Sequence, residues 1–273
     1  MEPLSTPSTQ SSLADGKVLV AREGAVGWIT FNRAERHNAL SVEMWAAIPQ
    51  ALDQLEADDA VRIIVLRGAG GKAFISGADI SQFETRRSGE SGNVGYDTLV
   101  GAANQRLAAT RCPTIAMVRG YCIGGGLGVA LQCDLRIATR ESRFGIPAAR
   151  LGVGYGHPGL KRLMDVVGPA NALEIFFTAR QFSADEALAM GLVNRVVEDG
   201  ELESFVGDYC ARVAENAPLT IGAVKICVGE LLRGRELDRE RCEEAVRACF
   251  ASEDYVEGRR AFMEKRQPVF KGR

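Results

Sequence analysis

The chain lacks the features that mark membrane and nucleic-acid-binding proteins. No apolar run approaches the roughly 20 residues needed to cross a bilayer. The net charge of −2 gives no basic footprint for a polyanion. The hydrophobic content of 46% and the charged content of 25% are ordinary for a soluble globular protein. We therefore expect no membrane partner and no nucleic-acid partner.

Metal-ligand patterns are also scarce. The chain has only two histidines, without ligand spacing, and its seven cysteines form no CxxC pair. The cysteines stand at positions 112, 122, 133, 210, 227, 242 and 249. Because most of them have apolar neighbours, we expect buried free thiols, no metal site and a reducing, cytoplasmic location.

The first residues lack both an apolar core and arginine, so they resemble neither a signal peptide nor a transit peptide. They are rich in Ser, Thr and Pro, and we expect residues 1–16 to form a disordered tail. At 273 residues, the chain suits one large domain or a domain with an appendage. We expect a sheet-bearing core over residues 17–200 and a helical region over residues 201–273.

The N-terminal half predicts alternating strands and helices. Apolar runs at 18–21 and 26–31 predict a hairpin, and Ser41 is a candidate N-cap for a helix to about residue 57. Pro49 lies inside that helical pattern and predicts a kink or a late start. Further expected elements are a strand at 61–67, a loop at 68–79, a mobile segment at 86–95, a helix at 96–110 and strands at 114–118 and 135–138. This alternation favours βαβ units with a parallel sheet.

The C-terminal third predicts helices. Ser183 and Glu186 have the spacing of a capping box, and a last strand is expected at 193–197. The expected helices span 201–216, 218–232, 237–250 and 255–265.

Three consecutive glycines, Gly124–Gly126, follow the strand expected at 114–118. The pattern predicts a strand, a tight turn and the N-terminus of a helix. Glycines there let a ligand approach the backbone, and the free N–H groups of a first helical turn favour a negatively charged oxygen. Alternatively, the glycines serve only close helix packing.

Several motifs occur in one order: NRAERHNAL at 32–40, AFISGADI at 73–80, the stretch 120–134 around the three glycines, FGIP at 144–147, ALAMGLVNRVV at 187–197 and GRRAFMEKRQPVF at 258–270. Together they resemble the crotonase, or enoyl-CoA hydratase/isomerase, superfamily over roughly residues 17–270. The resemblance implies an α/β fold, a spiral of ββα turns with a helical trimerisation region. It also implies acyl-CoA substrates, a homotrimer or a dimer of trimers, and no covalently bound cofactor, with coenzyme A as part of the thioester.

The resemblance also implies roles for individual residues. The backbone N–H groups of Ser76 and Gly125 would hold the thioester oxygen, which suits chemistry through an enolate; alternatively, Ser76 is only a turn residue. The residues expected to contact coenzyme A are Arg36, Lys72, Gly77, Ala78, Asp79, Phe262 and Lys265. Asp79 can instead cap the following helix, and the others can be surface or core residues.

The chain departs from the hydratase pattern at two positions. Where hydratases carry a pair of glutamates, this chain has Gly128 and Ala148, and neither can move a proton. A catalytic Asp of related isomerases and dehalogenases is replaced by Gly156. Its neighbours Tyr155 and His157 are the candidates that remain, as a hydrogen-bond donor and as an acid or base. Alternatively, Tyr155 packs against the sheet and His157 caps a helix.

Three functions remain open. The first is an acyl-CoA enzyme of the hydratase/isomerase type with altered acid–base groups. The second is a decarboxylase of malonyl-type thioesters, whose reaction forms an enolate without a protein base. The third is a protein that binds CoA thioesters without turnover.

Overall fold

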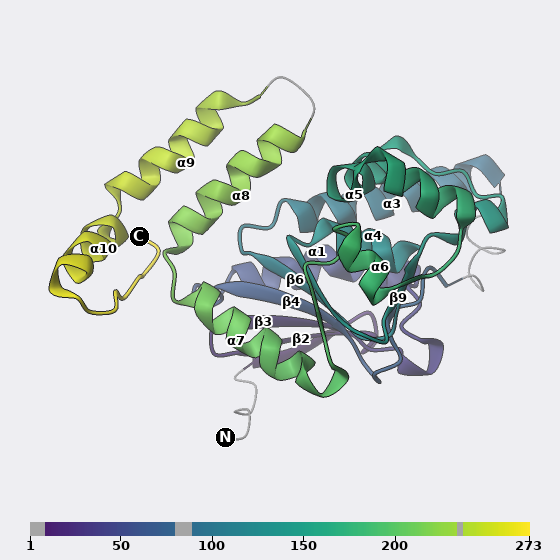
Figure 1. Cartoon of the computed structure of the whole chain (residues 1–273), viewed down its shortest axis with the longest axis horizontal. Helices are drawn as coiled ribbons and strands as arrows, with labels where there is room; N and C mark the ends of the chain where they lie inside the picture. The colour runs from purple at the N-terminus through teal and green to yellow at the C-terminus, as the bar shows by residue number, and fades with distance from the viewer. Residues whose placement is uncertain (1–8, 80–88, 234–236) are drawn as a thin grey trace.

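The computed structural model describes residues 9–79, 89–233 and 237–273. Within these residues, a seven-stranded sheet forms the centre of the molecule, in the order β1-β2-β3-β4-β6-β8-β11 (Figure 1). Its strands are β1 (Thr9–Leu13), β2 (Val18–Glu23), β3 (Val26–Phe31), β4 (Ile63–Gly68), β6 (Thr114–Val118), β8 (Leu135–Thr139) and β11 (Arg195–Val197). The hairpin β2–β3 is antiparallel, and β3, β4, β6, β8 and β11 are parallel neighbours. The predicted hairpin and parallel sheet are thus confirmed.

The N-terminal segment corrects one expectation. Residues 9–13 are not a disordered tail, because they form β1 and pair antiparallel with β2. The Ser11 hydroxyl also donates to Gln54 Oε1 at 2.6 Å. The expectation for residues 1–8 falls outside the described part of the chain.

A second sheet runs in the order β10-β9-β7-β5. Its strands are β10 (Phe182–Ser183), β9 (Arg143–Gly145), β7 (Tyr121–Ile123) and β5 (Ala73–Ile75). β5 lies inside the segment 68–79 that we expected to be a loop, and β7 inserts a strand before the three glycines. This sheet therefore brings the segment after β5 beside the segment after β7, where the candidate site lies.

The core helices lie where the sequence predicts them, but some of their ends differ from the predicted ends. α1 (Val42–Glu56) has Ser41 as its N-cap and continues through Pro49, so the late start is wrong. α3 (Gly89–Ala108) begins seven residues before the predicted start at residue 96. The predicted mobile segment is therefore helical from residue 89, and its residues 86–88 are outside the described part. The remaining core helices are α4 (Gly125–Gln132), α5 (His157–Thr178), α6 (Ala184–Ala189), α7 (Leu202–Ala214) and the 3-10 turns η1 (Ala34–Arg36), η3 (Pro147–Leu151) and η4 (Asp199–Glu201). The capping box of Ser183 and Glu186 is confirmed.

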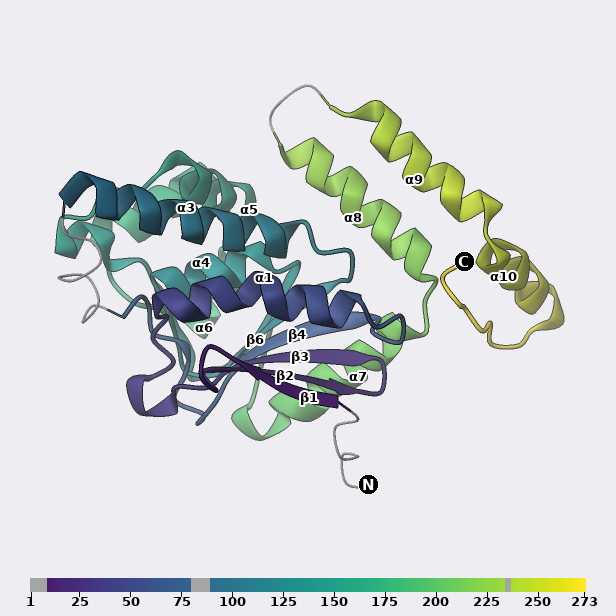
Figure 2. The same ribbon diagram turned by 180° about the vertical axis from the view of Figure 1, so that it is seen from behind.

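Side-chain alternation along the central strands divides the core in two. Ile64 and Leu66 of β4 belong to a large cluster that α1, α3 and α4 complete on one face of the sheet. Ile63 and Val65 belong to a smaller cluster on the other face, covered by α7. Figures 1 and 2 show these helices on the opposite faces. The alternation with a period of two residues is what two-sided burial of a strand requires.

Three helices leave the core as an extension, which we call the arm. They are α8 (Pro218–Leu232), α9 (Arg239–Ala251) and α10 (Glu253–Glu264), and both views show them projecting from the sheet domain (Figures 1 and 2). They confirm the predicted helical end of the chain. Between them lies a largely apolar groove of about 1040 Å³, lined among others by Val224, Val228, Val246, Phe250 and Phe262.

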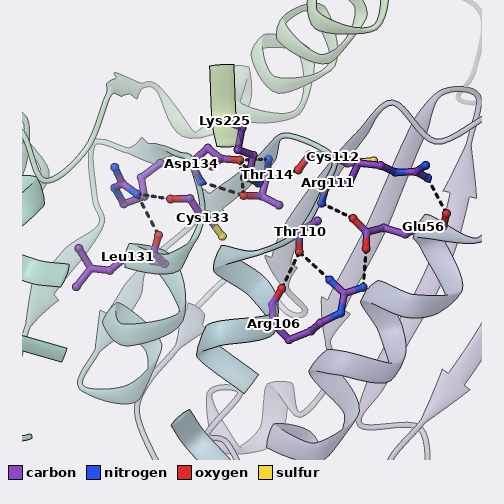
Figure 3. A network of polar contacts seen from close by, with 12 residues as sticks. Glu56, Arg106, Thr110, Arg111, Cys112, Thr114, Leu131, Cys133, Asp134 and Lys225 are labelled. Carbon is purple, nitrogen blue, oxygen red and sulfur yellow. Dashed lines mark hydrogen bonds and ion pairs between the residues drawn. The ribbon is translucent and has the colours of Figure 1, made fainter. Parts of the chain in front are cut away.

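One ion pair ties the arm to the core. Lys225 Nζ of α8 donates to Asp134 Oδ2 at 2.7 Å and to the Cys112 carbonyl at 2.9 Å (Figure 3). The same Asp134 oxygen accepts from the backbone N–H and the hydroxyl of Thr114. Among the described helices, none combines the length and the apolar character of a membrane span.

Candidate active site

The three glycines form the turn between β7 and α4. Gly124 adopts φ 54° and ψ −118°, a conformation that favours glycine, and its N–H donates to the Gly145 carbonyl at 2.8 Å. α4 begins at Gly125, and its first hydrogen bond runs from Gly128 N to Gly124 O at 3.0 Å. Within the described chain, the Gly125 N–H donates to no acceptor. It is therefore one of the free N–H groups at the N-terminus of the helix.

Ser76 does not offer a second free N–H group. Its backbone N–H donates to the His37 carbonyl at 3.1 Å, so our expectation that Ser76 holds the thioester oxygen is wrong. The motif indicates the segment but not the residue, because which N–H group is free depends on how this segment pairs with another.

Ala78 carries an N–H group that has no acceptor in the described residues. It forms a parallel bridge with Leu40, in which Leu40 N donates to Gly77 O at 2.8 Å and Asp79 N donates to Leu40 O at 2.9 Å. These bonds use the groups that flank Ala78, whose own N–H points to the other side of the strand and has no acceptor in the described residues.

The Ala78 and Gly125 N–H groups lie close together. A Cβ added to Gly125 would lie 3.8 Å from Ala78 N. Since a Cβ is about 2.5 Å from its own amide nitrogen, the two nitrogens are no more than about 6.3 Å apart. One oxygen between them can accept from both within the usual limit of about 3.2 Å. The pair can therefore stabilise a negatively charged oxygen.

The elements around this pair are packed tightly. A Cβ on Gly126 would collide with the Ile75 carbonyl of β5, so glycine is required for α4 to lie against this strand. Beside Gly125 lies the buried Trp45 ring of α1, 3.3 Å from the position of an added Cβ. Its indole N–H donates to the Tyr96 hydroxyl of α3 at 3.0 Å. This bond satisfies a polar group in the wall beside Gly125.

The two positions without glutamate differ in the space around them. A Cβ added to Gly128 meets no atom within 4 Å, so a side chain fits there. By contrast, Ala148 in η3 is buried, with only 8% of its surface exposed. Neither position supplies a carboxylate for proton transfer.

Tyr155 and His157 lie at the start of α5. The Tyr155 ring makes an edge contact with Phe176, with centroids 4.7 Å apart, and burial raises the pKa of its hydroxyl. His157 is exposed and is the first residue of α5, whose N-cap is Gly156, so the alternative that His157 caps this helix is wrong. Neither side chain forms a hydrogen bond with the described glycine stretch.

The residues expected to contact coenzyme A lie in two separate places. Arg36 and Lys72 are exposed and belong to neighbouring segments, since the Ala34 Cβ lies 2.5 Å from the position of a Cβ on Gly70. By contrast, Phe262 and Lys265 lie at the end of α10, far from α4 in both views (Figures 1 and 2). The structure of one chain therefore does not bring the two groups together.

Asp79 has an ion-pair partner that sequence reasoning missed. Its carboxylate accepts from Arg33 Nη1 at 2.9 Å, and the side chains of Arg33 and Asp79 are only 15% and 14% exposed. Whether Asp79 also caps a helix concerns residues 80–88, which are outside the described part.

Asn38 was missed as well. It is fully buried, and its amide donates to the carbonyls of Ala69 and Ala73. The signal for Asn38 was its place in the polar motif NRAERHNAL.

Comparison with known proteins identifies the family. The model of the enoyl-CoA hydratase/isomerase family matches residues 21–273. The chain belongs to this family. Short-chain-enoyl-CoA hydratase of Clostridium acetobutylicum is 37% identical over 254 residues, which are 92% of this chain and 95% of that protein. Crotonyl-CoA hydratase of Syntrophomonas wolfei is 33% identical and covers 94% of this chain and 99% of its own length.

Solved structures of the enoyl-CoA hydratase/isomerase family have the same fold. An enoyl-CoA hydratase/carnithine racemase from Magnetospirillum magneticum matches with a TM-score of 0.92 and 38% identity over 97% of each chain. An enoyl-CoA hydratase from Bacillus anthracis matches with a TM-score of 0.88 and 28% identity, covering 94% of this chain and 100% of that one. The predicted crotonase-like α/β fold is thus confirmed, and the chain is an acyl-CoA enzyme by family.

Proposed function

We propose that the protein acts on an acyl-CoA thioester through an enolate whose oxygen is held by the N–H groups of Ala78 and Gly125. The observation that carries this proposal is the pair of unbonded N–H groups, one at a helix N-terminus and one on a bridging strand. Donors fixed before the reaction stabilise charge as it develops on an oxygen. Losing one such donor typically costs about 2.7–4 kcal/mol of transition-state stabilisation.

The nucleotide end of coenzyme A would lie near Arg36 and Lys72, whose exposed cationic groups suit its phosphates. Phe262 and Lys265 would reach the coenzyme A of a neighbouring subunit, because α10 lies far from the glycines of its own chain. The exposed apolar side chains of the arm support this assembly. We therefore propose a homotrimer or a dimer of trimers in which the arm contacts a second copy.

Water addition is poorly supported by the residues at 128 and 148. Hydration needs a base for the water and an acid for the α-carbon, and Gly128 and Ala148 provide neither. We therefore keep decarboxylation of a malonyl-type thioester as the second candidate. That reaction releases CO₂ and leaves an enolate, so it depends on the two N–H groups more than on carboxylates. Tyr155 would donate a hydrogen bond to the substrate carboxylate or the enolate.

Two substrates assayed in parallel test these functions. Purified protein is given crotonyl-CoA, to follow hydration, and methylmalonyl-CoA, to follow CO₂ release. Hydration at ordinary enzyme rates would show that the absent glutamates do not matter. CO₂ release that is lost in Tyr155→Phe would establish the decarboxylase. Binding of both thioesters without turnover would favour the third reading, a protein that only binds CoA thioesters.

Position 128 offers a sharper test of the missing carboxylate. Because an added side chain meets open space there, Gly128→Glu should fold and should raise hydration of crotonyl-CoA by about 100-fold, the lower end of general acid–base catalysis. Gly128→Gln is the matched control, with the same shape and no proton-transfer group. Equal rates in the two variants would contradict the account.

A further inference from the structure

We propose that the Arg33–Asp79 ion pair is a positioning device that fixes the direction of the Ala78 N–H group. The inference rests on the proposed function, because it concerns the second donor of that site. Neither residue needs to touch the substrate. Their effect would pass through the backbone of residues 76–79.

The segment that carries Ala78 is bonded to the turn 37–40. β5 ends at Ile75, so residues 76–79 lie outside the sheet. Three hydrogen bonds join the two segments: Ser76 N to His37 O, Leu40 N to Gly77 O, and Asp79 N to Leu40 O. The direction of the Ala78 N–H group therefore depends on where the turn lies.

The turn itself has an uncommon backbone. His37 and Asn38 adopt φ values of 49° and 57°, in the left-handed region that residues with a side chain rarely occupy. Such a conformation persists where the surroundings hold it in place. Here the buried Asn38 side chain provides part of that support, by accepting from Arg33 N at 2.9 Å and donating to Ala73 O at 2.8 Å.

Arg33 connects both sides of this pairing. Its NH1 group donates to the Ala39 carbonyl at 3.0 Å, in the turn, and to Asp79 Oδ2 at 2.9 Å, one residue beyond Ala78. One guanidinium nitrogen thus spans the bridge between Leu40 and Ala78. Because both charged side chains are largely buried, the contact is screened less by water than a surface ion pair would be.

The test compares Arg33→Met with the control Arg106→Met. Arg106 of α3 also joins two segments, with bonds to Asp53 at 2.7 Å and to Glu56 at 2.5 Å. Figure 3 shows its contact with Glu56, beside the C-terminal end of α1 and away from the turn 37–40. The first readout is the carbonyl stretching band of butyryl-CoA bound to each protein, measured by difference infrared spectroscopy. This band moves to lower frequency when donors polarise the thioester. The second readout is kcat and KM on the thioester that the wild type turns over, and thermal unfolding reports stability.

We expect both variants to lower the melting temperature. Only Arg33→Met should return the carbonyl band toward its position in free butyryl-CoA, and kcat should fall by about 10- to 100-fold with KM within about threefold, as for a misplaced catalytic group. If Arg33→Met does not fold, Arg33→Lys replaces it, since lysine keeps the charge but cannot present the guanidinium fork.

Three results would overturn the inference. A band that stays shifted in folded Arg33→Met, with unchanged kcat, removes the positioning role and leaves the proposed function intact. If the carbonyl band and kcat of Arg33→Met/Asp79→Asn both return to the wild-type values, Arg33 only neutralises the Asp79 carboxylate. An unshifted band in the wild type would overturn the proposed function, and the positioning role with it.

Discussion

The core and the arm bury their apolar side chains to very different extents. α1 in the core buries seven residues, among them Trp45, Ile48 and Leu52. In the arm, α8 buries Ala223 and Glu230, α9 buries no residue, and α10 buries Asp254 and Ala261. Phe262 and Met263 are 83% and 80% exposed. The core thus completes its own packing, whereas the arm presents an apolar surface, which a second copy would cover in the proposed assembly.

Ion pairs occur in both regions, but in the arm they have little apolar burial beside them. The arm is held within its own chain by charged groups: Lys225 binds Asp134, and Asp254 accepts from the backbone N–H groups of Lys271 and Gly272. Glu257 pairs with Arg260 and Arg266, and the hydrogen bonds from Arg266 and Val269 lower its pKa. Apolar burial stabilises the core, and ion pairs orient the arm. Substitutions in each region should therefore have effects of different kinds.

The largest effect is expected at Gly125 in the core. The methyl group of Gly125→Ala would lie 3.3 Å from the Trp45 ring and 3.8 Å from Ala78 N, in the space that the proposed function assigns to the thioester oxygen. Because the methyl group would keep the oxygen away from both donors, we expect turnover to fall by at least about 100-fold, as much as on loss of an oxyanion donor, with a small change in melting temperature. Steady-state kinetics of the purified variant measure this. Near-normal turnover would show that the two N–H groups do not form the site.

The next largest effect separates burial in the core from exposure in the arm. Ile64→Ala removes a fully buried side chain of β4 and should cost about 2–5 kcal/mol of unfolding free energy. Phe262→Ala should change the stability of the core by no more than about 0.5 kcal/mol, and should instead shift the protein to smaller species in analytical ultracentrifugation. A similar loss of core stability in both variants would break the comparison.

A smaller effect is expected where the two regions meet. Lys225→Met removes an ion pair whose side chains are 15% and 33% exposed, between the buried and surface cases, so we expect a loss of about 1–3 kcal/mol in urea unfolding. The control is Lys161→Met, which removes an exposed i,i+4 pair with Asp165 and should cost about 0.3–0.5 kcal/mol. Equal losses would mean that the junction adds nothing specific.

The smallest effect concerns the thiols. Burial raises the pKa of Cys133 and of Cys210 to about 12, so at pH 8 only about one thiol in 10⁴ is the reactive thiolate. The half-buried Cys227 and Cys249 of the arm should be labelled by iodoacetamide before these core thiols, as mass spectrometry of peptides would show. Because reactivity follows the thiolate, labelling of the core should rise as the pH rises. Faster labelling of Cys133 than of Cys249 at pH 8 would contradict this order.

Local patterns in the sequence predicted what local forces decide. The Ser41 N-cap, the Ser183 capping box and the helix after the three glycines all follow from short-range hydrogen bonding and backbone freedom. β1 was missed because TQSSL has no strand pattern of its own and is a strand only by pairing with β2. The start of α3 was also missed, since Gly89–Gly95 has low helix propensity that the fold overrides.

The candidate site shows the same limit at the scale of one residue. The motifs located both segments of the site, but a single bond, from Ser76 N to His37 O, decides that Ala78 and not Ser76 has the free N–H group. That bond joins residues 39 positions apart, so no local pattern contains it. The resemblance to a family placed Phe262 near coenzyme A, whereas the single chain places it on the arm.

Under the proposed function, main-chain groups hold the thioester oxygen, and this has a consequence for how new reactions arise. A backbone N–H group is present whatever side chain a position carries, so the chemistry of the Ala78 donor does not depend on the alanine. The proton-transfer groups, by contrast, are side chains, and position 128 has room for one. In such a scaffold, the ability to stabilise an enolate is inherited with the fold, and the fate of that enolate is open to change by single substitutions.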